Sequence, residues 1–144
     1  MTRPHAPDDI SSLLLAFIGL IGHSLRAADG ENGLSLAQLK ALYSIGAAKA
    51  PTMKELADTF GITPPSVTAL VNRLVKEKLV KRIMSPSDRR TIRLELTPQG
   101  KTKLAKGRAL VAKKTNELTK ILSGRERREL ARVMQRIIEH HESQ

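Results

Sequence analysis

The 144-residue chain contains no cysteine and very few aromatic side chains. The absence of cysteine excludes disulfides, thiolate catalysis and a thiol-based redox switch. Aromatic residues make up 2% of the chain, so little flat surface is available for stacking on a planar ligand. The four histidines are scattered, apart from His140 and His141, and neither a Ser-His-Asp constellation nor a phosphate-binding glycine loop occurs. We therefore expect no metal site, no cofactor and no enzymatic activity.

The sequence also lacks a long hydrophobic run. The main apolar stretch, residues 13–22, is shorter than the roughly 20 apolar residues that a membrane-spanning helix needs. It is preceded by Asp8 and Asp9, where a signal peptide would carry cations. We therefore expect a cytoplasmic protein that has no membrane partner.

Acidic residues are outnumbered, with 14 Asp and Glu against 25 Lys and Arg and a formal net charge of +11. Residues 1–34 carry two basic and four acidic side chains, residues 35–97 carry eleven and five, and residues 98–144 carry twelve and five. A basic surface attracts phosphate and speeds encounter with nucleic acid. A merely soluble surface is the alternative, and so large a charge on a small protein makes it the less favoured one.

Two helices are expected in the middle of the chain. Thr52 and Glu55 stand three residues apart in the pattern of a capping box, so a short helix begins after Thr52, and Gly61 suits its left-handed end. Thr63 can cap a second helix, and Pro64 fits the first helical position, where an N–H would have no partner. The pattern predicts two helices joined by a tight turn, as in a helix-turn-helix.

The second of these helices is expected to have two faces. Its inward side is an apolar stripe at helical spacing, made of Val67, Leu70, Val71 and Leu74. Its outward side carries Pro65, Ser66, Thr68, Ala69, Asn72, Arg73 and Lys76. Small hydrogen-bonding residues followed by cations suit a helix that reads base edges in the major groove, so we predict that this face binds DNA. The alternative is an ordinary helical hairpin with a solvated face.

A β-hairpin is expected after the two helices. Strand-forming residues in 79–84 precede a Ser-Pro-Ser turn, and residues 88–97 alternate apolar and polar side chains. The pattern places Asp88, Arg89 and Arg90 at the hairpin tip. Arginine suits a narrow, A·T-rich minor groove, and Asp88 can hold the guanidinium of Arg90 in one orientation. The alternative is a solvated turn with a surface ion pair.

Helix, turn, helix and hairpin in this order describe a winged helix. The motifs are Ser-Leu-Ala-Gln-Leu-Lys-Ala-Leu from Ser35, Thr-Met-Lys-Glu-Leu-Ala from Thr52, Ser-Val-Thr from Ser66, Leu-Val-Lys-Arg from Leu79, Asp-Arg-Arg from Asp88 and Leu-Thr-Pro-Gln-Gly from Leu96. In these motifs and their spacing, the chain resembles the MarR (multiple antibiotic resistance regulator) family of bacterial transcription factors. Lys78 departs from the family pattern, which usually has glycine there. If Lys78 has a positive φ, a non-glycine residue there costs on the order of 1 kcal/mol. The alternative is that the helix ends differently, which would change the placement of the hairpin.

The segments on either side of the winged helix should form helices with much apolar surface. The first carries a stripe of Ile10, Leu13, Leu14, Phe17, Ile18, Ile21 and Leu25, with Leu15 and Leu20 outside it. A long helix should begin at Pro98, and a capping box at Ser123 and Glu126 should begin a last one. That last helix is expected to bury Leu130, Val133, Met134, Ile137 and Ile138. The family resemblance implies a two-fold dimer; the alternative is packing on the same chain's winged helix.

We therefore predict a mostly α-helical fold with a small β wing, compact as a whole. Residues 1–34 would form an N-terminal arm and a dimerisation helix, and residues 35–97 the winged helix-turn-helix. Residues 98–144 would form the C-terminal dimerisation helices.

The predicted function is a sequence-specific, DNA-binding transcriptional regulator, a homodimer and, as is more frequent in the resembled family, a repressor of a palindromic operator. Thr52, Lys54 and Arg82 are further candidates, for contacts with DNA phosphates. The alternative is a winged-helix module that binds a protein, RNA or the shape of DNA without strong sequence selection. A large ratio of specific to non-specific DNA affinity belongs only to the first.

A small-molecule effector of unknown identity is a further candidate partner. Members of the resembled family that take aromatic acids bind them between the dimerisation helices and the winged helix. The resemblance places a candidate effector pocket near Phe17, His23, Leu42 and Tyr43. Core packing is the alternative for each of these residues.

Overall fold

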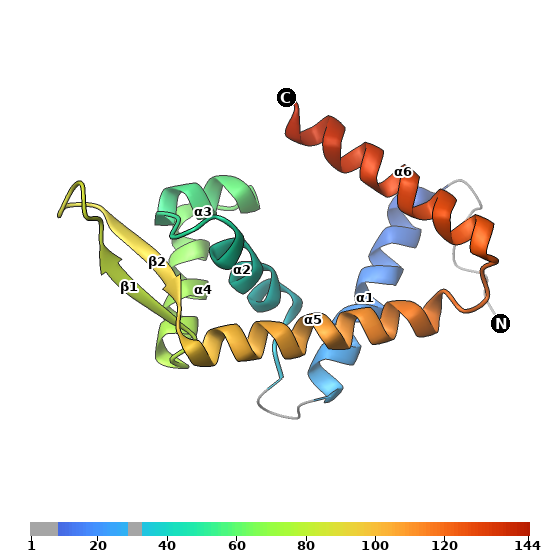
Figure 1. Cartoon of the computed structure of the whole chain (residues 1–144), viewed down its shortest axis with the longest axis horizontal. Coiled ribbons are helices and arrows are strands. Elements are labelled where there is room, and N and C mark those ends of the chain that lie inside the picture. Colours follow the sequence, from blue (N-terminus) through green and yellow to red (C-terminus); the bar gives the residue numbers. More distant parts are fainter. Residues whose placement is uncertain (1–8, 29–32) are drawn as a thin grey trace. The chain divides into compact units, whose positions relative to one another are not determined.

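A computed structural model describes residues 9–28 and 33–144 of the chain (Figure 1). Residues 1–8, which include the start of the expected N-terminal arm, lie outside the described residues. The elements are α1 (Ile10–Ala28), α2 (Leu36–Ala47), α3 (Met53–Phe60), α4 (Pro64–Lys76), β1 (Val80–Met84), β2 (Ile92–Leu96), α5 (Pro98–Leu118) and α6 (Gly124–Glu142). The predicted fold class, mostly helical with a two-stranded wing, is confirmed. Internal contacts divide the chain into two compact units, residues 1–111 and 112–144, and each is described by itself.

The core of the first unit lies among α2, α3, α4 and the sheet. Ala41 and Leu42 of α2, Val71 and Leu74 of α4, and Leu94 of β2 are completely buried. Helix α2 begins at a capping box, in which Ser35 and Gln38 hydrogen-bond to each other's backbone N–H. This capping box, like those at Thr52 and Ser123, determines the residue at which its helix begins.

Helix α1 exposes most of its apolar side chains. Ile21 and Leu25, near its C-terminal end, are buried in the first unit, whereas Leu15 is 71% exposed and Phe17 38% exposed. The helix has 19 residues and a mean hydropathy of 1.6 in its most apolar window, so by length and composition it could cross a membrane. The prediction that this segment is too short to span a membrane is therefore wrong, because the helix extends beyond residues 13–22 on both sides.

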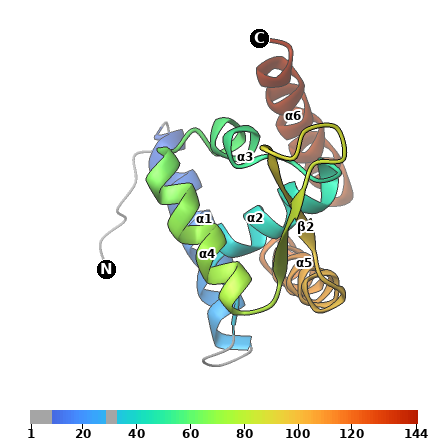
Figure 2. The ribbon, with the colours of Figure 1, turned by 90° about the vertical axis from the view of Figure 1, so that its left-hand side faces the viewer.

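The hairpin is antiparallel, and its register pairs Val80 with Leu96, Arg82 with Leu94 and Met84 with Ile92. Its inner end is buried and its outer end is exposed, because only the residues nearest the helices pack on the core (Figure 2). Alternation in β2 therefore buries Leu94 fully but leaves Ile92 40% exposed.

A tight junction joins α4, the sheet and α5. Lys78 has φ 60°, so of the two alternatives for this position the structure has the left-handed conformation that usually favours glycine. Thr97 holds this turn, since its hydroxyl donates to the carbonyl of Lys78 at 2.6 Å and its N–H donates to the carbonyl of Leu79 at 3.1 Å. The same hydroxyl accepts from the N–H of Gly100 at 2.9 Å in the first turn of α5. Thr97 thus fixes the turn that follows α4 to the start of α5.

The second unit contains the end of α5 and helix α6. Ser123 and Glu126 form the expected capping box, and the hydrogen bonds from the N–H and hydroxyl of Ser123 lower the pKa of Glu126. The expectation that α6 buries its apolar stripe is wrong for the single chain. The exposed residues are Leu130, Val133, Met134, Ile137 and Ile138, at 40% to 64%. A unit of 33 residues (112–144) is too small to cover such a stripe by itself.

Candidate nucleic-acid interface

The helix-turn-helix is built as the sequence predicts at its first helix. The hydroxyl of Thr52 accepts from the N–H of Glu55 at 3.1 Å, and the Glu55 carboxylate accepts from the N–H of Thr52 at 2.8 Å. Gly61 ends α3 in the left-handed conformation, with φ 61°. At the start of α4 the expected cap differs: the side chain of Thr63 makes no cap hydrogen bond and instead contacts the hydroxyl of Ser66 at 3.0 Å. A side-chain cap is less necessary here, because Pro65 at the second helical position has no N–H and the N–H of Ser66 donates to the carbonyl of Thr63 at 3.0 Å.

The outward face of α4 is placed as predicted. Its members Pro65, Ser66, Thr68, Ala69, Asn72, Arg73 and Lys76 are all exposed. On the opposite side Val67, Val71 and Leu74 are buried, so this helix cannot rotate to hide the face without unpacking the core. The hydroxyl of Thr68 donates to the carbonyl of Pro64 at 2.9 Å, which points its oxygen along the helix.

Two residues of this face already have partners without DNA. The side-chain oxygen of Asn72 accepts a hydrogen bond from the guanidinium of Arg82 on β1. Asn72, which we predict to contact a base, is therefore bonded to Arg82, which we predict to contact a phosphate. The guanidinium of Arg73 donates to the carboxylate of Glu77, the C-cap residue of α4, at 3.1 Å. Asn72, Arg73, Lys76 and Glu77 together line an open groove at the end of the helix.

The hairpin tip carries the expected cations, and Arg89 and Arg90 are both exposed. The carboxylate of Asp88 accepts from the backbone N–H of Arg90 at 2.9 Å and from the hydroxyl of Thr91 at 3.1 Å. We expected the carboxylate to hold the guanidinium of Arg90. It holds the backbone of the turn instead, because an aspartate at the start of a turn reaches the N–H two residues on more readily.

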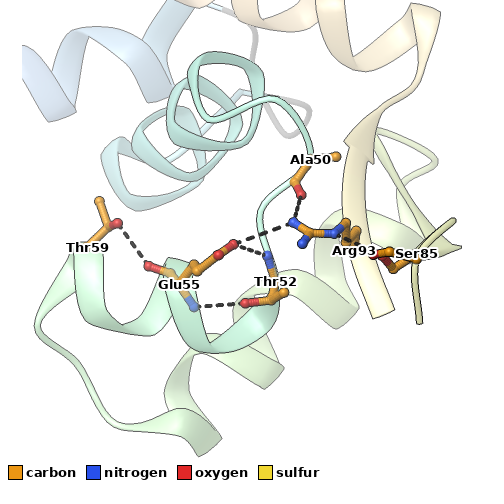
Figure 3. Close-up of polar contacts among 7 residues, drawn as sticks. Ala50, Thr52, Glu55, Thr59, Ser85 and Arg93 are labelled. Carbon is orange, nitrogen blue, oxygen red and sulfur yellow. Dashed lines mark hydrogen bonds and ion pairs between the residues drawn. The ribbon is translucent and has the colours of Figure 1, made fainter. Parts of the chain in front are cut away.

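Sequence reasoning missed the role of Arg93, which it treated only as a polar residue of the alternating strand. Its guanidinium donates to the carbonyl of Ala50 at 2.9 Å, and its Nε donates to the hydroxyl of Ser85 at 3.4 Å (Figure 3). The carboxylate of Glu55 lies 3.8 Å from the same guanidinium. No local pattern signals these contacts, since Ala50 and Arg93 are far apart in the chain.

The residues proposed for phosphate contacts lie at the start of α3 and on β1. Lys54 is exposed, Thr52 is half-buried in its capping box, and Arg82 is exposed beside Asn72. Thr52 caps α3 and Lys54 lies in its first turn, whereas Arg82 lies on β1, and both of these elements pack against α4.

The candidate effector residues do not share one environment. Leu42 is completely buried in the core, which is its alternative interpretation. Tyr43 is half exposed and lies under the guanidinium of Arg108, 5.5 Å from the ring centre. Phe17 and His23 lie on α1 and are exposed. Within residues 9–28 and 33–144, no group of three or more His, Asp or Glu residues could hold a metal ion.

Comparison with known proteins agrees with this geometry. The model of the MarR family matches residues 32–91. The HTH-type transcriptional repressor MdtR of Bacillus subtilis is 30% identical over 115 residues, which cover 77% of this chain and 74% of the relative. The uncharacterised HTH-type transcriptional regulator YsmB of the same species is 36% identical over 62 residues, which cover 43% of this chain and 40% of YsmB.

Crystal structures of MarR from E. coli have the same fold. The reduced form has a TM-score of 0.80 and 25% sequence identity, with 92% of this chain and 98% of that chain covered. A mutant MarR complexed with operator DNA has a TM-score of 0.69 and 26% identity, with 88% and 91% covered. Both the match of the winged helix and the likeness of the whole chain lead to one conclusion: this chain belongs to the MarR family of DNA-binding transcriptional regulators.

Proposed function

We propose that the protein is a homodimeric, sequence-specific repressor that acts in the cytoplasm on a palindromic operator. The observation that carries this proposal is the exposed row of short polar and basic side chains on α4, next to a hairpin whose tip carries Arg89 and Arg90. A helix of this kind fits the major groove, and an adjacent arginine fits the neighbouring minor groove.

The proposed contacts divide by chemistry. Ser66, Thr68, Asn72 and Arg73 would read base edges, because amide, hydroxyl and guanidinium groups can match the donor and acceptor patterns of the bases. Pro65 and Ala69 would allow close approach, and Thr52, Lys54, Lys76 and Arg82 would contact phosphates. Arg90 would enter the minor groove, with Arg89 beside it and Asp88 shaping the turn.

The proposed dimer rests on two apolar surfaces that the single chain leaves uncovered. Leu13, Leu14 and Leu15 of α1 are 47%, 54% and 71% exposed, and Ile137 of α6 is 64% exposed. Monomeric soluble proteins rarely expose contiguous apolar surface on this scale, whereas a second copy would cover it. This arrangement also accounts for the hydropathy of α1 without a membrane. A two-fold dimer would present two α4 helices to successive half-sites of a palindrome.

Selection of bound sequences from random double-stranded DNA tests the proposal. We expect a recovered palindrome whose half-sites lie about 10 base pairs apart, or a multiple of that, centre to centre. Affinity for this sequence should exceed that for scrambled DNA by about 1,000-fold or more. Recovery of sequences without a common motif would support binding of DNA shape, and recovery of a single half-site would contradict the dimer.

Substitutions at the hairpin tip test the proposed minor-groove contact, and the direction of the change in DNA affinity is decisive. Arg90→Ala should weaken binding about tenfold, most strongly at sites with A·T-rich flanks, because a narrow minor groove attracts guanidinium most. Asp88→Ala should also weaken binding, although it removes a negative charge, because the carboxylate fixes the Arg90 N–H and the Thr91 hydroxyl. Fluorescence anisotropy with labelled DNA at fixed salt measures both.

Glu95→Gln is the charge-matched control for Asp88→Ala. Glu95 lies on the same hairpin and pairs with Lys81 at 3.3 Å, away from the turn. Simple electrostatics predicts that both variants bind DNA more tightly. A gain in affinity for Asp88→Ala equal to that of Glu95→Gln would eliminate the shaping role of Asp88.

An effector is a further part of the proposal. A ligand can release DNA only by binding the DNA-free dimer more tightly than the complex. Tyr43, Phe17 and His23 are exposed and could contact such a ligand, whereas Leu42 would require opening of the core.

A further inference from the structure

The guanidinium of Arg93 lies where the hairpin, the α2–α3 linker and the start of α3 come together (Figure 3). It donates to the carbonyl of Ala50 at 2.9 Å and to the hydroxyl of Ser85 at 3.4 Å, and it lies 3.8 Å from the carboxylate of Glu55. We call these three contacts the Arg93 bridge. It connects segments that are up to 43 residues apart in sequence.

The linker side of the bridge is strained. Lys49 and Ala50 have φ of 50° and 71°, a conformation that non-glycine residues rarely adopt. Such a conformation persists only when neighbouring structure holds it. Here the carbonyl of Ala50 accepts from Arg93, and the carbonyl of the next residue, Pro51, accepts from the N–H of Leu94 at 2.9 Å. Strand β2 therefore fixes the linker from which α3 begins.

The hairpin side of the bridge leads to the wing turn. Ser85 is only 3% exposed, and it follows the last residue of β1. Its N–H donates to the carbonyl of Thr91 at 2.8 Å, and its hydroxyl contacts that of Ser87 at 3.1 Å. Thr91 in turn donates to Asp88, which holds the N–H of Arg90. A continuous series of hydrogen bonds thus runs from Ala50 through Arg93 to the arginine at the tip.

The capping box of α3 is the third side of the bridge. The same carboxylate oxygen of Glu55 that faces Arg93 accepts from the N–H of Thr52 at 2.8 Å. The pair of Glu55 and Arg93 is long, and the Glu55 side chain is 60% exposed, so its charge attraction is weak in water. The consequence of the bridge is therefore geometric: it sets the wing turn relative to the start of the helix-turn-helix.

We propose that Arg93 is a positioning residue for DNA recognition, which sets the angle between the wing and the α3–α4 pair without contacting DNA. The inference rests on the proposed function and deepens it. Arginine is required because its planar fork reaches the Ala50 carbonyl and the Ser85 hydroxyl at the same time, which a lysine ammonium on its flexible stem does not reproduce. The wing and the recognition helix then approach the duplex as one unit.

Arg93→Ala should weaken binding to the selected operator about fivefold to tenfold, chiefly by misplacing Arg90. In an Arg90→Ala background the same substitution should have almost no further effect, because the contact it positions is already gone. Arg93→Lys should recover less than half of the loss in log affinity. Lys81→Ala is the matched control: it removes one cation from the same hairpin without touching the linker, and it should cost less than Arg93→Ala.

Three outcomes would overturn the positioning role: additive losses in the double variant, full recovery by Arg93→Lys, or an equal loss for Lys81→Ala.

Amide hydrogen exchange gives a readout that is independent of DNA. Arg93→Ala should speed exchange in residues 49–52 and in residues 85–91 together, while the buried half of α4 stays protected. Unchanged exchange in either segment would refute the bridge. If Arg90→Ala leaves binding unchanged, the proposed minor-groove contact fails, and hydrogen exchange alone decides the role of Arg93.

Discussion

Gly100→Ala should unfold the protein at much lower denaturant concentration, with a loss of about 3 kcal/mol or more in the free energy of unfolding. A Cβ at this position would lie 2.0 Å from the carbonyl oxygen of Leu79 and 2.9 Å from its carbonyl carbon. Both are backbone atoms of the junction that Thr97 holds, so neither can move aside alone. Helix propensity predicts the opposite sign, because alanine in a helix is favoured over glycine by about 1 kcal/mol.

Gly107→Ala is the matched control, because it lies in the same helix and is also buried. Its Cβ would lie 2.6 Å from a terminal methyl carbon of Leu39, a side-chain atom that can move away by changing rotamer. We therefore expect a distinctly smaller loss. Urea or guanidinium unfolding followed by circular dichroism compares the two, and equal midpoints would show that the close approach at Gly100 relaxes freely.

Local patterns predicted the elements of the winged helix well, for physical reasons. A capping box needs only residues three apart, so the start of α3 at Thr52 and that of α6 at Ser123 could be predicted from sequence. Helical periodicity separated the buried Val71 from the exposed Asn72, because a helix that packs on a core must alternate with this period. The positive φ of Lys78 could not be decided from sequence, because a lysine there fits either a left-handed residue or a different helix end, and the structure has the left-handed residue.

Contacts between distant segments could not be predicted in the same way. The bridge from Arg93 to Ala50 depends on how β2 lies beside the linker, which no spacing rule states. The link between Arg82 and Asn72 depends likewise on the packing of β1 against α4. The expected pairing of Asp88 with the Arg90 guanidinium failed for a different reason, since two local acceptor contacts compete for the carboxylate.

The exposure of α6 illustrates a limit that comes from assembly. Periodicity identified its apolar stripe correctly, but it does not say which surface covers that stripe. We expected α6 to bury Val133 and Ile137, and in the single chain they are 40% and 64% exposed. The same reasoning applies to the candidate site: the pattern predicts which side chains of α4 are exposed, whereas their contacts with DNA stay predictions.

Substitutions on the exposed face of α4 should weaken DNA binding and leave the stability of the fold almost unchanged. Arg73→Ala and Asn72→Ala should each cost about 1–3 kcal/mol in affinity for the selected operator if the side chain reads a base edge. Both residues are exposed, and the Arg73 side chain has 69% of its surface exposed beside Glu77, so the melting temperature should hardly change. Titration of operator and scrambled DNA at one salt concentration, together with thermal unfolding, measures both quantities.

Lys76→Ala is the matched control on the same helix, because we assign Lys76 to phosphate. It should weaken binding to operator and scrambled DNA equally and reduce the dependence of affinity on salt.

Asn72→Ala has one additional consequence, since it also removes the partner of Arg82. Arg82→Ala must therefore be measured beside it: if the two losses on operator DNA are the same and do not add in the double variant, the amide acts by holding Arg82. A loss for Asn72→Ala that appears on operator but not on scrambled DNA, and that Arg82→Ala does not reproduce, would assign base reading to Asn72 itself.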